Sequence, residues 1–214
     1  MQQILVYADS LSWGIIPNTR QRFPFEQRWP GVLEITLNLQ GQHVRIIEDC
    51  LNGRRTVWDD SFKPGRNGLS GLAQRIEVNS PLCLVILMLG TNDFQSMHDN
   101  NAWHSSQGIL ALISCIRNAP IEPGMPVPEI LVVCPPAISS PKGPIAPKFE
   151  GGEKKCLGLA AAYQKVCDEV GCHFFDAGSV VSSSVIDGVH LDKAEHAVLG
   201  DALSKVVLPL LAKH

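Results

Sequence analysis

The chain has 214 residues, a formal net charge of −3 and 18% charged residues, below the ~25% that is typical of globular proteins. It contains no dense cluster of Lys and Arg, which argues against a nucleic-acid-binding protein. No low-complexity linker divides the chain, so we expect a single domain over residues 1–214. The low charge content is compatible with a homo-oligomer.

No apolar run reaches the ~20 residues that a membrane-spanning helix needs. Met1 leads directly into the first predicted strand without a basic start or a cleavage site, so we expect no signal peptide and a cytoplasmic location. The seven cysteines are scattered and odd in number, which favours reduced thiols over a disulfide framework. No Cys/His spacing predicts a metal site.

The first predicted element is a buried strand over residues 4–8, which stops abruptly at Asp9 and Ser10. Open α/β sheets bind ligands beyond the carboxyl ends of their strands, so Ser10 lies where a ligand would bind. The structural alternative is that Asp9 or Ser10 only caps the next element, since both residue types are favoured caps. A proline-containing loop over 15–27 follows and lies beside this serine.

Helical spacing of apolar residues over 29–40 and a strand over 44–47 come next. They lead to the block Leu51-Asn52-Gly53-Arg54. Gly53 has no side chain, so its backbone N–H can approach a ligand closely. Taken alone, this glycine is better explained as part of a simple turn.

The continuous apolar run over 82–89 predicts a central strand that is covered on both faces. It ends at Gly90-Thr91-Asn92-Asp93, where the Asn92 amide offers two N–H donors to a ligand. Asn and Asp are also ordinary turn formers. The pattern beyond this block predicts a helix over 103–118, a strand over 130–134, a proline-rich loop over 135–152 that could wall a pocket, a helix over 157–170 and a strand over 173–175.

A last polar block, Asp187-Gly188-Val189-His190, precedes a final helix that the quartet Asp192 to Glu195 would begin. The start of this helix would hold His190 in place. His196 falls inside the helix, and we interpret it as a surface histidine.

Five strands that alternate with helices predict a parallel sheet in a three-layer α/β/α sandwich. Ser10, Gly53 and Asn92 each follow a strand, so they should meet at the carboxyl edge of that sheet. His190 would reach the same edge from the loop before the last helix.

In their order, the blocks at Asp9-Ser10-Leu11, at Gly53, at Asn92 and at His190 resemble the four signature blocks of the SGNH (GDSL) hydrolase superfamily. The stretches 10–14, 149–153 and 175–179 are more specifically similar to its bacterial arylesterase branch, which includes enzymes that transfer acyl groups to alcohols or to peroxide. One departure is Ala8, which replaces the first glycine of the family's Gly-Asp-Ser motif. This replacement costs little if φ is negative at that position.

The resemblance implies a flavodoxin-like sheet of order 2-1-3-4-5 and a serine esterase that needs no metal or organic cofactor. Its catalytic residues would be Ser10, Asp187 and His190, with an oxyanion hole formed by the N–H groups of Ser10 and Gly53 and the side chain of Asn92. Asp9 and Asp93 would be structural.

The implied substrate is a small-molecule ester with a short acyl chain on an aryl or alkyl alcohol. Trp13, three residues after the nucleophile, is the candidate substrate-binding residue of an apolar acyl pocket, with packing of the first loop as its alternative role. The same site could serve an acyltransferase or perhydrolase, a thioesterase, a lysophospholipase or a carbohydrate deacetylase. Outside enzymes, the alternative is a flavodoxin-like binding domain with a degenerate site.

Overall fold

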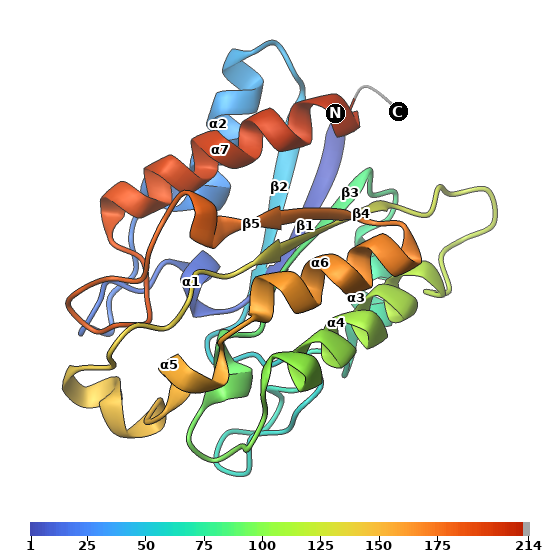
Figure 1. Ribbon diagram of the computed structural model, residues 1–214. Helices are drawn as coiled ribbons and strands as arrows, with labels where there is room; N and C mark the ends of the chain where they lie inside the picture. The colour runs from blue at the N-terminus through green and yellow to red at the C-terminus, as the bar shows by residue number, and fades with distance from the viewer. Residues whose placement is uncertain (212–214) are drawn as a thin grey trace.

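The computed structural model describes residues 1–211, so the last three residues of the expected domain, His214 included, lie outside the described part. Its centre is an all-parallel five-stranded sheet of order β2-β1-β3-β4-β5, covered by helices on both faces (Figure 1). The expected α/β sandwich and its strand order are therefore confirmed. The strands are β1 (Gln2–Ala8), β2 (Val44–Cys50), β3 (Leu84–Met88), β4 (Glu129–Cys134) and β5 (His173–Asp176).

The two faces of the sheet bury two separate apolar cores. Because side chains alternate along a strand, Leu5 and Tyr7 of β1 point into one core while Ile4 and Val6 point into the other. The first core is covered by α3 (Leu72–Asn79), α4 (Ala102–Arg117) and α6 (Leu159–Val170), and the second by α2 (Trp29–Leu39) and α7 (Lys193–Leu211) (Figure 1).

The register of three adjacent strands, β2, β1 and β3, aligns their carboxyl ends. Ala8, the last residue of β1, lies beside Cys50 of β2 and Met88 of β3, each the last residue of its own strand. The segments that follow these three strands therefore leave the sheet side by side, which is the geometry that the polar blocks require.

Short helical turns occupy several of the connections. They are α1 (Ser10–Trp13), η1 (Phe25–Gln27), η2 (Thr91–Phe94), η3 (Gly143–Lys148), α5 (Gly152–Lys155) and η4 (Ala177–Ser179). The proline-rich stretch 135–152 is thus partly ordered by its own hydrogen bonds and is not one irregular loop. Within residues 1–211, no helix combines the length and the apolar character that crossing a bilayer demands.

The interpretation of His196 as a surface histidine is wrong. Its side chain is fully buried between α7 and α2, where Nδ1 accepts the backbone N–H of Trp29 at 3.2 Å. Trp29 is the first residue of α2, and Arg28 before it makes no side-chain cap, so His196 takes the place of a cap. Burial lowers the pKa of His196 to about 3, so this imidazole stays neutral.

The two helices α2 and α7 lie close together at Gly200 of α7. A Cβ atom at this position would lie 2.6 Å from Val32 side-chain atoms and 2.9 Å from the backbone oxygen of Trp29. The absence of a side chain at residue 200 therefore lets the two helices pack directly against each other.

Gly200→Ala should lower the free energy of unfolding by about 1–3 kcal/mol through overpacking, although alanine is the better helix former by ~1 kcal/mol at an exposed site. Urea unfolding measures the change. Lys205→Ala, at an exposed position of the same helix, is the control and should stay within about 0.5 kcal/mol of the parent. A Gly200→Ala variant as stable as the parent would contradict the close packing.

Candidate active site

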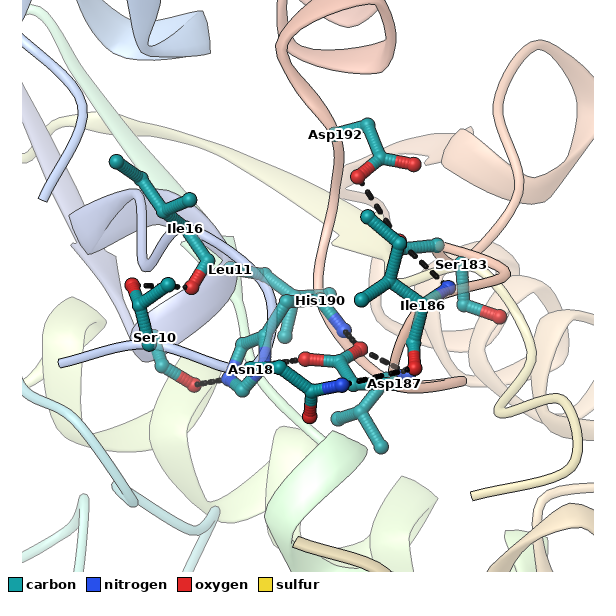
Figure 2. A network of polar contacts seen from close by, with 12 residues as sticks. Ser10, Leu11, Ile16, Asn18, Ser183, Ile186, Asp187, His190 and Asp192 are labelled. Atoms are coloured by element: carbon teal, nitrogen blue, oxygen red, sulfur yellow. Dashed lines mark hydrogen bonds and ion pairs between the residues drawn. The ribbon is translucent and has the colours of Figure 1, made fainter. Parts of the chain in front are cut away.

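His190 lies between Ser10 and Asp187 in a continuous line of hydrogen bonds (Figure 2). Its Nε2 is 3.1 Å from Ser10 Oγ, and its Nδ1 is 2.7 Å from Asp187 Oδ2. All three side chains are buried. The structure therefore brings the three predicted catalytic residues together, although 180 positions separate Ser10 from His190 in the chain.

The loop before α7 fixes Asp187 and His190 relative to each other. Asp187 Oδ1 accepts the backbone N–H groups of Val189 and His190, each at 2.9 Å, while Oδ2 faces the imidazole. Gly188 between them has φ +77°, and a Cβ there would lie 2.3 Å from Ser140 O, so only glycine fits. Burial opposes ionisation of Asp187, but the bonds from His190 and the backbone outweigh it and lower the pKa of the carboxyl.

Ser10 is the first residue of α1, directly after β1. Asp9 caps this short helix by accepting the N–H of Leu11 at 2.9 Å. Ala8 ends an ordinary extended strand, and among the non-glycine residues of 1–211 a positive φ occurs at Asn18, not at Ala8. The missing motif glycine therefore leaves the nucleophile turn without backbone strain.

Gly53 and Asn92 line the same cavity as Ser10, so these three predicted residues also meet. Both ends of the Asn92 amide are oriented: Nδ2 donates to Asp9 Oδ2 at 2.9 Å, and Oδ1 accepts from Gln95 Nε2 at 2.6 Å. Because Nδ2 carries two hydrogens, one N–H is left to point at a ligand.

A series of buried polar side chains, Gln95, Arg55 and Asp60, holds the Asn92 amide in place. The sequence patterns did not predict this series. Gln95 accepts a short hydrogen bond from Arg55, and Arg55 forms an ion pair with Asp60 at 2.9 Å. Arg55 is fully buried, so its charge depends on these partners. Gln95 and Arg55 belong to no recognised motif. Their supporting role is visible only in the hydrogen bonds that connect them to Asn92.

Asp9 and Asp93 are buried carboxyl groups with structural contacts, as expected. Asp93 joins the segments after β2 and β3, since it accepts hydrogen bonds from the N–H and hydroxyl of Thr56 and from Ser105 Oγ. Burial raises the pKa of Asp9 and of Asp93 to about 6 in each case, against the opposing effect of these hydrogen bonds.

The cavity above Ser10 has a volume of about 470 Å³. The predicted wall 135–152 contributes Pro144, Ile145, Lys148 and Phe149, whereas Trp13 is not among the lining residues. Instead, the Trp13 indole stacks against Arg22, whose guanidinium carbon lies 4.8 Å from the centroid of the indole ring. The structure therefore does not support a substrate-binding role for Trp13. The cavity is lined by Ser10, Ile15, Asn18, Thr19, Arg20, Asn52, Gly53, Lys63, Asn92, Pro144, Ile145, Lys148, Phe149, Asp187 and His190.

This arrangement can carry out nucleophilic acyl transfer. It offers a hydroxyl within reach of an imidazole, a carboxylate that orients the imidazole, and N–H donors beside the hydroxyl. Within the described residues, no group of three or more His, Cys, Asp and Glu side chains is placed to hold a metal ion.

Comparison with known proteins gives consistent matches. Residues 9–198 match the model of the GDSL-like lipase/acylhydrolase family. The fold is similar to the native aryl esterase of M. smegmatis (36% identity, TM-score 0.92, covering 98% of this chain and 100% of that one). It is equally similar to a carbohydrate acetylesterase from Sinorhizobium meliloti (33% identity, TM-score 0.92, with coverage of 98% and 100%). An arylesterase of Vibrio mimicus is 34% identical over 92 residues, which are 43% of this chain and only 38% of that protein.

The raised pKa of Asp9 predicts how stability depends on pH. The folded state binds the Asp9 proton more tightly than the unfolded state, so the contribution of Asp9 is present below pH 3.8 and is lost as pH rises through about 6. Asp9→Asn cannot titrate. Its free energy of unfolding relative to the parent should therefore rise by up to about 3 kcal/mol between pH 4 and pH 7.

Denaturant unfolding at several pH values measures the difference in free energy of unfolding between the variant and the parent. A cost of the substitution that does not depend on pH cancels when values at two pH are compared. Asp187→Asn is the control: the pKa of Asp187 is lowered, so the stability of this variant relative to the parent should not rise over the same range. A pH-independent difference for Asp9→Asn would contradict the raised pKa.

Proposed function

Because the chain belongs to the GDSL-like lipase/acylhydrolase family, we propose that it is a serine esterase that hydrolyses small carboxylic esters through an acyl-enzyme on Ser10. The observation that carries this proposal is the line of hydrogen bonds from Asp187 through His190 to Ser10 at the floor of the cavity. Nucleophile, base and acid stand there in the order that acyl transfer requires.

In the first half-reaction, Ser10 Oγ attacks the ester carbonyl carbon while His190 Nε2 takes the hydroxyl proton. Asp187 accepts the Nδ1–H bond, fixes the tautomer and stabilises the charged imidazolium. The tetrahedral intermediate then collapses, the bond to the leaving oxygen breaks, and His190 returns the proton to that oxygen.

In the second half-reaction, His190 removes a proton from water, and the resulting hydroxide attacks the acyl-enzyme carbonyl. Collapse releases the carboxylic acid and gives the proton back to Ser10. The net reaction consumes one ester and one water and yields one acid and one alcohol.

Three N–H donors stabilise the oxyanion in both steps. The N–H of Ser10 lies in the first turn of α1, where helix geometry provides no backbone acceptor, and the N–H of Gly53 makes no hydrogen bond with other described residues. The second N–H of Asn92 Nδ2 completes the set. Since Asp9 and Gln95 hold this amide in place before substrate binds, little reorganisation is needed in the transition state.

The cavity favours substrates of modest size. Its volume of about 470 Å³ lies in the lower half of the range for small-molecule sites, ~300–1,000 Å³. Apolar side chains of Ile15, Ile145 and Phe149 form part of its wall, which suits a short acyl chain or an aryl alcohol. The similarity to a carbohydrate acetylesterase supports a small acyl group, and the similarity to an aryl esterase supports an aryl alcohol.

Ser10→Ala should lower kcat/KM on 4-nitrophenyl acetate by about 10⁴-fold or more, because it removes the nucleophile. The far-UV circular dichroism spectrum should be unchanged, since within residues 1–211 the side-chain hydrogen bond of Ser10 is the one to His190.

Ser12→Ala on the same helix is the matched control. Ser12 Oγ accepts a hydrogen bond from the indole N–H of Trp29 at 3.0 Å. Ser12→Ala should therefore have a lower Tm than the parent but an unchanged kcat. Parent-like activity of folded Ser10→Ala, or an equal loss in folded Ser12→Ala, would refute the assignment of the nucleophile.

Asn92→Ala should lower kcat by roughly 10²–10³-fold with little change in KM, because the lost hydrogen bond strengthens mainly in the transition state. Steady-state kinetics with the same ester separates the two constants. A large rise in KM at unchanged kcat would instead make Asn92 a ground-state binding group.

A further inference from the structure

The mouth of the cavity carries an excess of positive charge. Arg20, Lys63 and Lys148 line it, and they come from three separate segments: the loop after α1, the connection between β2 and α3, and η3. The acidic lining residue is Asp187, whose carboxylate is already bound to His190 and to the backbone. The chain as a whole has a net charge of −3, so this local excess does not follow from composition.

Among the residues that the structure describes, these three cations have no acidic partner. Within residues 1–211, none of their side chains lies within 4.0 Å of a carboxylate. The acidic residue whose charge acts on both lysines is Asp60, which opposes the lowering of their pKa values. That carboxylate is engaged by the guanidinium of Arg55 and by the N–H groups of Phe62 and Lys63.

The charges are close enough to repel one another. Burial lowers the pKa of Lys148, and the positive charges of Arg55, Lys63 and Arg20 lower it further. Burial also lowers the pKa of Lys63, with Arg66 and Arg20 adding to the effect. Like charges gathered around a cavity are unfavourable by themselves, and an anion bound among them would relieve the repulsion.

We propose that the substrate is a small ester that carries an anionic group, such as a carboxylate, which Arg20, Lys63 and Lys148 bind at the mouth of the cavity while the ester carbonyl lies at Ser10. This inference rests on the proposed esterase function and names the class of its substrate. The cations attract the anion over several ångströms and hold it by charge-assisted hydrogen bonds. Their placement around the rim selects anionic esters over neutral esters of the same size.

The test compares matched water-soluble esters. One pair places the charge on the leaving group: 4-acetoxybenzoate against methyl 4-acetoxybenzoate. The other pair places it on the acyl group: the 4-nitrophenyl monoester of adipic acid against 4-nitrophenyl hexanoate. In at least one pair, kcat/KM for the anionic member should exceed that for the neutral member by about tenfold at low ionic strength, and the preference should shrink as salt is added.

The triple variant Arg20→Gln, Lys63→Gln, Lys148→Gln should abolish this preference. Its matched control is Arg45→Gln, Lys165→Gln, Lys205→Gln, which removes the same net charge at exposed positions away from the cavity lining and should keep the preference. Since both pairs are free in water, a preference assigns the cations to a small ester and not to an anionic membrane surface.

The outcomes separate the two proposals. Equal kcat/KM for the anionic and neutral members of both pairs would overturn the anionic-substrate inference. So would a preference for the anionic member that persists in the triple variant of Arg20, Lys63 and Lys148. Neither result would count against the proposed esterase function. Failure of the parent protein to hydrolyse any of the four esters would instead count against the proposed function itself.

Discussion

The site depends on one constraint, which is the common register of three adjacent strands, β2, β1 and β3. Ala8, Cys50 and Met88 lie side by side as the last residues of β1, β2 and β3, so Ser10, Gly53 and Asn92 emerge at one edge of the sheet. A shift of register by one residue would move every side chain of a strand to the opposite face, and so into the wrong one of the two cores. The hydrophobic packing that holds the register therefore also positions the reactive groups.

Hydrogen bonds between buried polar groups then fix the orientation of the turn at Ser10 and of the Asn92 side chain. Asp9 caps the turn that carries Ser10 and also accepts a hydrogen bond from the Asn92 amide, so one carboxylate links the proposed nucleophile to the proposed oxyanion donor. Gln95, Arg55 and Asp60 extend the chain behind Asn92. Such networks are stable only when their members are satisfied, because an unpaired buried charge is costly. The raised pKa of Asp9 reflects the cost of burying this group. In contrast, the described part of the chain places no carboxylate in an ion pair with Arg20, Lys63 or Lys148 at the mouth of the cavity, where an anionic substrate would supply the negative charge.

Hydrophobic runs and polar blocks predicted all five strands and the edge at which Ser10, Gly53 and Asn92 meet, because apolar runs report burial directly. The strand order came from the family resemblance, since local patterns do not encode which strands pair. Proximity in sequence misled for Trp13, whose indole turns to Arg22 and away from the cavity. His196 and Arg55 were missed because polar residues at interior positions depend on distant partners, here the N–H of Trp29 and the side chains of Asp60 and Gln95.

The central claim is that Ser10 is the residue that carries the acyl group. The most direct measurement is intact-protein and peptide mass spectrometry after reaction with an excess of a 4-nitrophenyl alkylphosphonate, which transfers its phosphonyl group to an activated serine. We expect one phosphonyl group per chain, located on Ser10, with loss of activity in proportion to labelling. Full inactivation with the label on another residue, or full labelling of Ser10 with activity retained, would contradict it.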